Sequence, residues 1–200
     1  ETEIEHYRDV IHACRENGIE PVVTLFHFTS PKWLISKGGW ESEETPAYFA
    51  RYTRYVVERL GGELHYVCTI NEANMGIQVA AIAKRYMQQM MAKMQAAREN
   101  AAVQGDPEQS GTTKDSTVQM GLNLEKMMAN QEAAQAERME LFGVPKTECF
   151  TSPRTSRGDE LVMDAHKAAR AVIRELAPHI QVGLSLSLHD IQALPGGEEN

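Results

Sequence analysis

The sequence lacks several features that would place it in particular protein classes. No apolar run approaches the roughly 18–20 residues that are needed to span a bilayer. No charged segment followed by an apolar one opens the chain, so nothing marks it for secretion. Positive charge is also scarce, because the net charge is −8. An acidic balance argues against nucleic acid as the main partner, since phosphate binding needs a basic surface.

Cysteine is scarce as well, and its spacing predicts neither disulfides nor a zinc site. Cys14, Cys68 and Cys149 lie far apart and form no CxxC pair. Three cysteines cannot pair fully, which favours a reduced, cytoplasmic setting. His189-Asp190 has no third ligand at suitable spacing, so we predict no metal site there.

The composition is otherwise that of a soluble globular protein. The 200 residues are 42% hydrophobic and 24% charged, which is enough for one sizeable core. The chain opens on Glu1, not on Met, inside a predicted helix. We therefore expect a piece of a longer protein.

The first 70 residues predict a βαβ unit. Helical spacing covers residues 2–17 and 46–60, and compact β-rich runs cover residues 22–28 and 64–70. A loop is predicted over residues 29–45. Strands joined through a helix run parallel in a right-handed connection, so their carboxyl ends lie on the same side of the sheet.

The rest of the chain is predicted to be mainly helical. Gly and Pro mark the breaks between its elements. We predict helices over residues 74–100, 119–141 and 159–176, loops over 101–118 and 142–158, and a third strand over 182–188 that leads to His189-Asp190.

Polar residues follow the two predicted strands at their carboxyl ends. His27 lies at the end of the first strand, and Asn71-Glu72 follow the second. Barrel and open α/β enzymes place their chemistry at this edge. Glu72 there could move a proton while Asn71 holds a substrate hydroxyl. The alternatives are a solvated carboxylate for Glu72, a satisfied core histidine for His27 and a helix cap for Asn71.

Each of three other groups of residues could have either of two roles. Trp33 and Trp40 could stack on sugars, but packing within the loop is the commoner role. The methionines at 87, 90, 91 and 94 could form a partner surface, or pack as an ordinary helix face. Basic residues between the last two predicted helices could hold a phosphate or lie scattered on an exposed loop; these are Lys146, Arg154 and Arg157.

The sequence resembles the family-1 glycoside hydrolases, the β-glucosidase family. The residues that carry the resemblance are Thr24-Leu25-Phe26-His27-Phe28, Pro31, Trp33-Leu34, Gly38-Gly39-Trp40 and Thr69-Ile70-Asn71-Glu72. Their order and spacing match over about residues 6–82. A weaker match covers about residues 159–190.

The resemblance implies an α/β fold, because these enzymes are (β/α)8 TIM barrels. The chain would be a partial TIM barrel, holding about strands 3 to 5 with their helices. It would form a single domain over residues 1–200, with a helical insertion at about 83–158. By the same resemblance, Glu72 is the general acid/base, Asn71 binds the sugar beside the scissile bond, and His27 contacts the glycone hydroxyls. No cofactor is implied, and the partner is a small-molecule β-glucoside.

The chain departs from the family pattern in several places. Phe28 stands where the family often has Trp, Ala73 where it often has Pro, and Ser187 where many relatives have Asn. The family's nucleophile, a Glu in a T/S-E-N-G motif, does not occur in these 200 residues. The nucleophile is therefore expected outside them, and half of the carboxylate pair of a retaining glycosidase is missing.

We therefore predict a fragment of a cytoplasmic, retaining β-glycosidase that hydrolyses β-glucosides, and expect the isolated fragment to be inactive. A 6-phospho-β-glucosidase is the alternative within the enzyme class. A non-catalytic, helix-rich interaction module is the alternative outside it. Parallel strands taken from a closed barrel leave two unpaired edges, so we also expect poor solubility or oligomers from this piece alone.

Overall fold

The computed structural model describes residues 1–103 and 124–188 of the chain. The chain divides into two compact units. The first, here called the sheet unit, comprises residues 1–28, 43–75 and 159–200. The second, the helical unit, comprises residues 29–42 and 76–158.

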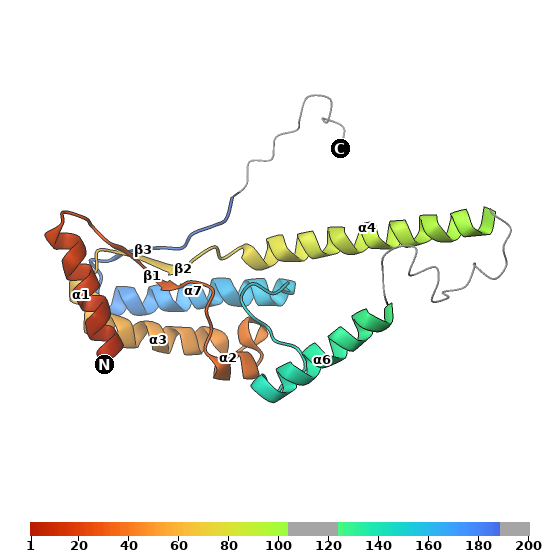
Figure 1. The fold of residues 1–200 in the computed structure, drawn as a ribbon. Coiled ribbons are helices and arrows are strands. Elements are labelled where there is room, and N and C mark those ends of the chain that lie inside the picture. The colour runs from red at the N-terminus through yellow and green to blue at the C-terminus, as the bar shows by residue number, and fades with distance from the viewer. Residues whose placement is uncertain (104–123, 189–200) are drawn as a thin grey trace, which may run out of the picture. The chain divides into compact units, whose positions relative to one another are not determined.

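A three-stranded parallel sheet forms one layer of the sheet unit (Figure 1). Its strands are neighbours in chain order: β1 (Val22–Phe26), β2 (Tyr66–Ile70) and β3 (Gln181–Gly183). Val23 pairs with Val67, which pairs in turn with Val182. The parallel pairing predicted for the first two strands is therefore confirmed. Two strands end earlier than predicted, β1 at Phe26 and β3 at Gly183.

Helices α3 (Thr45–Leu60) and α7 (Ser156–Leu176) run along one face of this sheet (Figure 1). Both are amphipathic, with apolar residues three or four apart facing the core. Burying one large aliphatic or aromatic side chain contributes about 1.5–3 kcal/mol, so these faces account for much of the unit's stability. The buried apolar residues of the two helices are Phe49, Val56, Val57, Leu60, Leu161, Val162, Ala165, Ala169, Val172 and Ile173.

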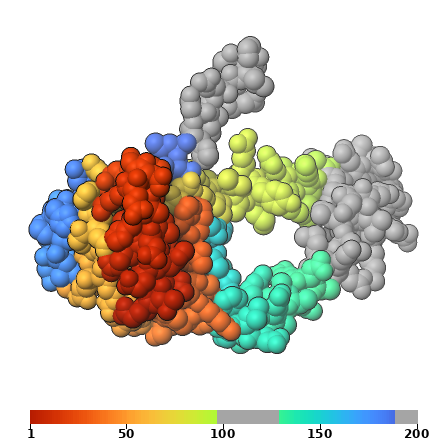
Figure 2. Space-filling view, turned by 60° about the vertical axis from the view of Figure 1, so that its left-hand side comes forward, coloured from red at the N-terminus to blue at the C-terminus, as the bar shows by residue number. Residues whose placement is uncertain are grey.

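Helix α1 (Thr2–Glu16) packs against α3 and lies on the surface of the sheet unit (Figure 2). Ile4 and Ile11 form its buried stripe, whereas Tyr7 and Val10 are exposed. Ile4 and Ile11 are seven residues apart, so they lie on the same face of the helix.

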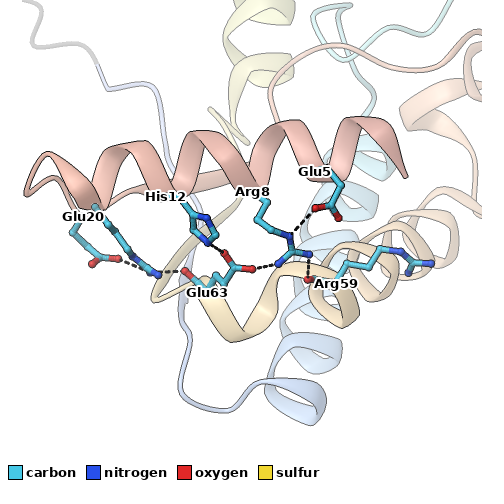
Figure 3. A network of polar contacts seen from close by, with 7 residues as sticks. Glu5, Arg8, His12, Glu20, Arg59 and Glu63 are labelled. Carbon is cyan, nitrogen blue, oxygen red and sulfur yellow. Dashed lines mark hydrogen bonds and ion pairs between the residues drawn. The ribbon is translucent and has the colours of Figure 1, made fainter.

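A polar network joins α1 to the turn η2 (Gly61–Glu63), just before β2 (Figure 3). Arg8 and His12 both contact the Glu63 carboxylate, with His12 Nε2 at 2.6 Å from Oε2. Arg15 donates to the backbone carbonyl of Glu63, and Arg8 donates to the Arg59 carbonyl at 2.9 Å. The network thus fixes α1 at the amino end of the sheet, opposite the edge where the candidate site lies.

The helical unit contains α2 (Lys32–Ser36), η1 (Gly39–Glu41), most of α4 (Met75–Val103) and α6 (Leu124–Phe142). The prediction of a loop over residues 29–45 was therefore wrong in part. Pro31, which follows β1 in the chain, is the N-cap of α2. Helix α4 extends to Val103, into the predicted loop 101–118, whose other residues lie outside the described part.

No helix in the described ranges, 1–103 and 124–188, combines the length and the apolar character needed to cross a membrane.

Candidate active site

The ends of β1 and β2 bring the predicted site residues to one edge of the sheet. Phe26 and Ile70 are paired, so His27 and Asn71 each follow a residue of that pair. The Asn71 N–H donates to the Phe26 carbonyl at 2.9 Å, which continues the ladder one step beyond β2. Adjacent strands lie about 4.8 Å apart, so His27 and Asn71 leave neighbouring strands at the same height.

Each of the two strands is followed by a residue in the left-handed backbone conformation. Phe28 and Glu72, each two residues past the Phe26–Ile70 pair, have φ values of 66° and 48°. These are the only non-glycine residues with positive φ in the described ranges. The left-handed region is sterically unfavourable for side chains larger than glycine, and such residues cluster at functional sites. His27 is exposed and Glu72 is half-buried.

A segment that follows β3 runs beside the turn at Glu72. The Ser185 N–H donates to the Ile70 carbonyl at 3.2 Å, and the Ala73 N–H donates to the Ser185 carbonyl at 3.0 Å. The Asn71 side chain accepts a hydrogen bond from the Ser185 hydroxyl at 3.0 Å. The side-chain oxygen of Asn71 is thus directed to the third strand's extension.

Behind the edge, Thr69 connects β2 to α7 and β3. Its hydroxyl is fully buried, lies 2.7 Å from His166 Nδ1 and donates to the Gly183 carbonyl at 3.2 Å. Burial lowers the pKa of His166, and the nearby Arg170 and Lys167 lower it further. His166 is therefore neutral near pH 7. No role was predicted for His166, because nothing in its spacing pointed to Thr69.

Within the helical unit, Trp40 packs and does not form an exposed platform. Its side chain is 1% exposed, stands edge-on to Phe150 with ring centres 5.0 Å apart, and donates from Nε1 to Ser30 Oγ at 3.2 Å. The packing interpretation of Trp40 is confirmed. Trp33, on α2, is 48% exposed.

Of the basic residues that could have held a phosphate, Arg154 is buried, whereas Lys146 and Arg157 are exposed. Arg154 is 6% exposed, donates to the Phe150 carbonyl at 2.7 Å and lies over the Phe150 ring at 4.6 Å. Lys146 pairs with Glu148 at 2.6 Å. The prediction of scattered basic residues on an exposed loop was therefore wrong for Arg154, whose charge supports the packing of Phe150.

The described residues contain no group of three or more His, Cys, Asp or Glu side chains that could hold a metal ion. His189-Asp190, considered above as a metal pair, lie outside the described residues.

Comparisons with known proteins identify relatives for the same part of the chain. A 6-phospho-β-glucosidase of Escherichia coli is 40% identical over 72 residues, which are 36% of this chain and 15% of that protein. A human cytosolic β-glucosidase is 38% identical over 71 residues, again 36% of this chain and 15% of that protein. The matched residues therefore span about one seventh of the length of these curated relatives.

Solved structures match over nearly the whole chain. The crystal structure of the β-glycosidase BGL167 is 33% identical with a TM-score of 0.65, and covers 98% of this chain and 39% of that one. The structure of β-glucosidase 1317 is 25% identical with a TM-score of 0.59, and covers 92% of this chain and 36% of that one. Residues 1–140, well over half of the chain, match glycosyl hydrolase family 1. The chain therefore belongs to glycosyl hydrolase family 1.

Proposed function

We propose that the protein containing this chain is a retaining β-glycosidase that hydrolyses the O-glycosidic bond of β-glucosides. The observation that carries the proposal is the position of Glu72, which follows Asn71 at the carboxyl edge of a parallel sheet, level with the end of β1 and His27. Membership of glycosyl hydrolase family 1 supports the reaction class. Relatives named as β-glucosidases support the substrate class.

Glu72 would act as the general acid/base. In the first step its carboxylic acid protonates the departing glycosidic oxygen, while a second carboxylate attacks the anomeric carbon and forms a glycosyl-enzyme. In the second step the Glu72 carboxylate removes a proton from water, whose oxygen displaces the enzyme carboxylate. Asn71 and His27 would bind hydroxyl groups of the sugar and orient the ring.

The second carboxylate has to come from outside these 200 residues. The sequence contains no T/S-E-N-G motif. In a retaining glycosidase the two carboxyl groups stand about 5–5.5 Å apart. We therefore propose that another part of the full-length protein supplies the nucleophile, and that this chain alone does not hydrolyse glycosides.

The fold supports the same proposal. Neighbouring parallel strands in chain order are the pattern of a (β/α)8 barrel, in which each strand pairs with the next. We propose that β1, β2 and β3 are about strands 3 to 5 of such a barrel, in one domain interrupted by a helical insertion at about 83–158.

The test compares leaving groups in the full-length protein. Replacement Glu72→Gln removes the transferable proton and keeps the size of the side chain. Acid catalysis typically contributes about 10²–10⁴-fold, so kcat/KM for a phenyl β-glucoside should fall by that factor. For 2,4-dinitrophenyl β-glucoside, which needs little protonation, kcat/KM should fall far less. Glu3→Gln, which changes an exposed residue on α1, is the matched control and should leave kcat/KM unchanged for both substrates.

If Glu72→Gln keeps full activity on the phenyl glucoside, the acid/base assignment is wrong. A protein that hydrolyses 6-phosphoglucosides but not glucosides would favour the alternative substrate class within the family. That alternative is supported by the E. coli relative, whose name states a 6-phospho-β-glucosidase.

A non-catalytic interaction module is the alternative outside the enzyme class. Helix α4 favours it, because Ile82, Tyr86, Met87 and Met91 are exposed along its length. Absence of hydrolysis by the full-length protein on glucosides and 6-phosphoglucosides alike would support that alternative.

A further inference from the structure

Ser185 contacts both of the residues that the proposed mechanism uses on β2. Its hydroxyl oxygen accepts a hydrogen bond from the Glu72 backbone N–H at 2.9 Å. The same hydroxyl donates to Asn71 Oδ1 at 3.0 Å. A serine hydroxyl has one proton and two lone pairs, so it satisfies both contacts at once.

The direction of these hydrogen bonds fixes the amide of Asn71. The Glu72 N–H can only donate, which leaves the serine proton for Asn71. With its oxygen bound to this proton, Asn71 keeps the Nδ2 donors for another acceptor, such as a sugar hydroxyl oxygen. If the Asn71 amide were flipped, both its Nδ2 group and the Glu72 N–H would donate to the Ser185 hydroxyl oxygen. The Ser185 proton would then have no acceptor on Asn71.

The same contact holds Glu72 in a backbone conformation that a glutamate rarely adopts. Its φ of 48° lies in the left-handed region. Strained residues persist where surrounding contacts over-determine them. Here the Ser185 hydroxyl binds the N–H of the strained residue, and the Ser185 carbonyl binds the N–H of Ala73 on its other side at 3.0 Å.

A second clamp, two residues further along both segments, keeps Ser185 in place. Asn74 Nδ2 donates to the Ser187 carbonyl at 2.7 Å, and the Ser187 N–H donates to Asn74 Oδ1 at 2.8 Å. The amide of Asn74 thus pairs with the backbone of Ser187 as a neighbouring strand would. This pairing continues beyond Gly183, where β3 ends.

We infer that Ser185 is a positioning residue for the acid/base: through one hydroxyl it sets the backbone of Glu72 and the amide orientation of Asn71. The inference rests on the proposed function. Ser185, in the segment after β3, would transfer no proton to the substrate. It would affect the reaction only through its hydrogen bonds to Glu72 and Asn71.

The experiment uses the full-length protein and the ratio of kcat/KM between 2,4-dinitrophenyl and phenyl β-glucoside. Ser185→Ala removes the hydroxyl. A misplaced acid costs most where the leaving group needs a proton, so the ratio should rise roughly tenfold. Ser185→Thr keeps the hydroxyl and should return the ratio to within about twofold of the original protein. Ser36→Ala, which removes an exposed hydroxyl bonded to the Lys32 carbonyl, is the matched control and should leave it unchanged.

A purely structural role would lower both activities in proportion and leave the ratio as it was. That outcome in a folded Ser185→Ala protein would overturn the inference, as would a threonine variant with the ratio of the alanine variant. Should Ser185→Ala fail to fold, Ser185→Cys keeps the side chain's size with a much weaker donor, and its ratio should rise in the same direction.

The two proposals fail separately. A Glu72→Gln protein with an unchanged ratio removes the proposed function, and the positioning role with it. A raised ratio in Glu72→Gln with an unchanged ratio in both Ser185→Ala and Ser185→Cys removes the positioning role alone.

Discussion

Gly39, the first residue of η1, provides the sharpest test of how Trp40 packs against residues 148–150. Its φ is +55°, and a Cβ built on it would lie 1.8 Å from the Glu148 carbonyl oxygen and 2.9 Å from the carbonyl carbon. Real Cβ contacts do not fall below 3.0 Å, so Gly39→Ala must move one backbone segment by at least about 1.2 Å. Such a shift would break the Trp40 N–H contact with the same carbonyl, which is already 3.4 Å long.

The expected cost has two parts. Placing alanine in the left-handed region costs about 1–2 kcal/mol. Forcing extra volume into packed surroundings costs typically another 1–3 kcal/mol. We therefore expect Gly39→Ala to lower the free energy of unfolding by about 2–5 kcal/mol, measured by urea denaturation of the full-length protein. Loss of Trp40 fluorescence intensity or a shift of its emission should accompany it.

Two other glycines separate the two contributions. Gly38 has a φ of +98°, and a Cβ added to it would lie 3.6 Å from its nearest neighbour, Ser42 Cβ. Gly38→Ala should therefore show the conformational cost alone. Gly62 has no positive φ and no atom within 4 Å, and its replacement by alanine should change stability by no more than about 0.5 kcal/mol. If Gly39→Ala and Gly38→Ala destabilise equally, the close approach of Gly39 to Glu148 does not exist in solution.

Two further predictions concern pH. The lowered pKa of His166 means that the unfolded chain binds a proton more readily below pH 6.5, so stability should fall as pH drops from 7 towards 5. His166→Asn, whose amide can still bond to Thr69, should weaken this dependence of stability on pH. If thermal melts between pH 7 and 5 show the same dependence in the variant, His166 is not its source. The pKa of Tyr52 is raised by burial and then by Tyr7, while its hydroxyl donates to the Leu25 carbonyl at 3.1 Å. Stability should therefore fall as pH rises above 10, and Tyr52→Phe should flatten that fall at a cost of about 0.5–1.5 kcal/mol at neutral pH.

Sequence patterns predicted the starts of β1 and β3 better than their ends, whereas for β2 the end at Ile70 was predicted and the start was placed two residues early. The run over 182–188 alternates Leu and Ser, which is typical of a strand, yet β3 ends at Gly183. Beyond it the chain still lies beside the Glu72 turn through the bonds of Ser185 and Ser187, without regular ladder pairing. Whether a β-prone run is paired depends on its neighbour's backbone, and that neighbour here turns left-handed at Glu72. Periodicity contains no information about such a turn.

Proline gave a similar half-right prediction in the loop. Pro31 lies in the predicted loop over residues 29–45, and it does follow the end of β1. It is also the N-cap of α2, with φ −66° and ψ 146°, because the fixed φ of proline fits the extended backbone that precedes a helix as well as a loop. A five-residue helix has too few turns to show a periodic pattern, so the sequence could not distinguish the two.

In the candidate site, too, some features were predicted from the sequence and others were not. His27, Asn71 and Glu72 were predicted to share an edge because a βαβ connection fixes the direction of both strands, and that argument needs no contact between side chains. Thr69–His166 and Glu72–Ser185 were not predicted, since their partners lie 97 and 113 residues apart in the chain. Ser185 bonds to the Glu72 N–H and to the Asn71 amide, whereas the Thr69–His166 contact connects β2 to α7. The geometry of the proposed acid/base therefore depends on the segment after β3 as well as on the Thr69–Glu72 motif, so a substitution at Ser185, 113 residues from Glu72 in the chain, should affect it.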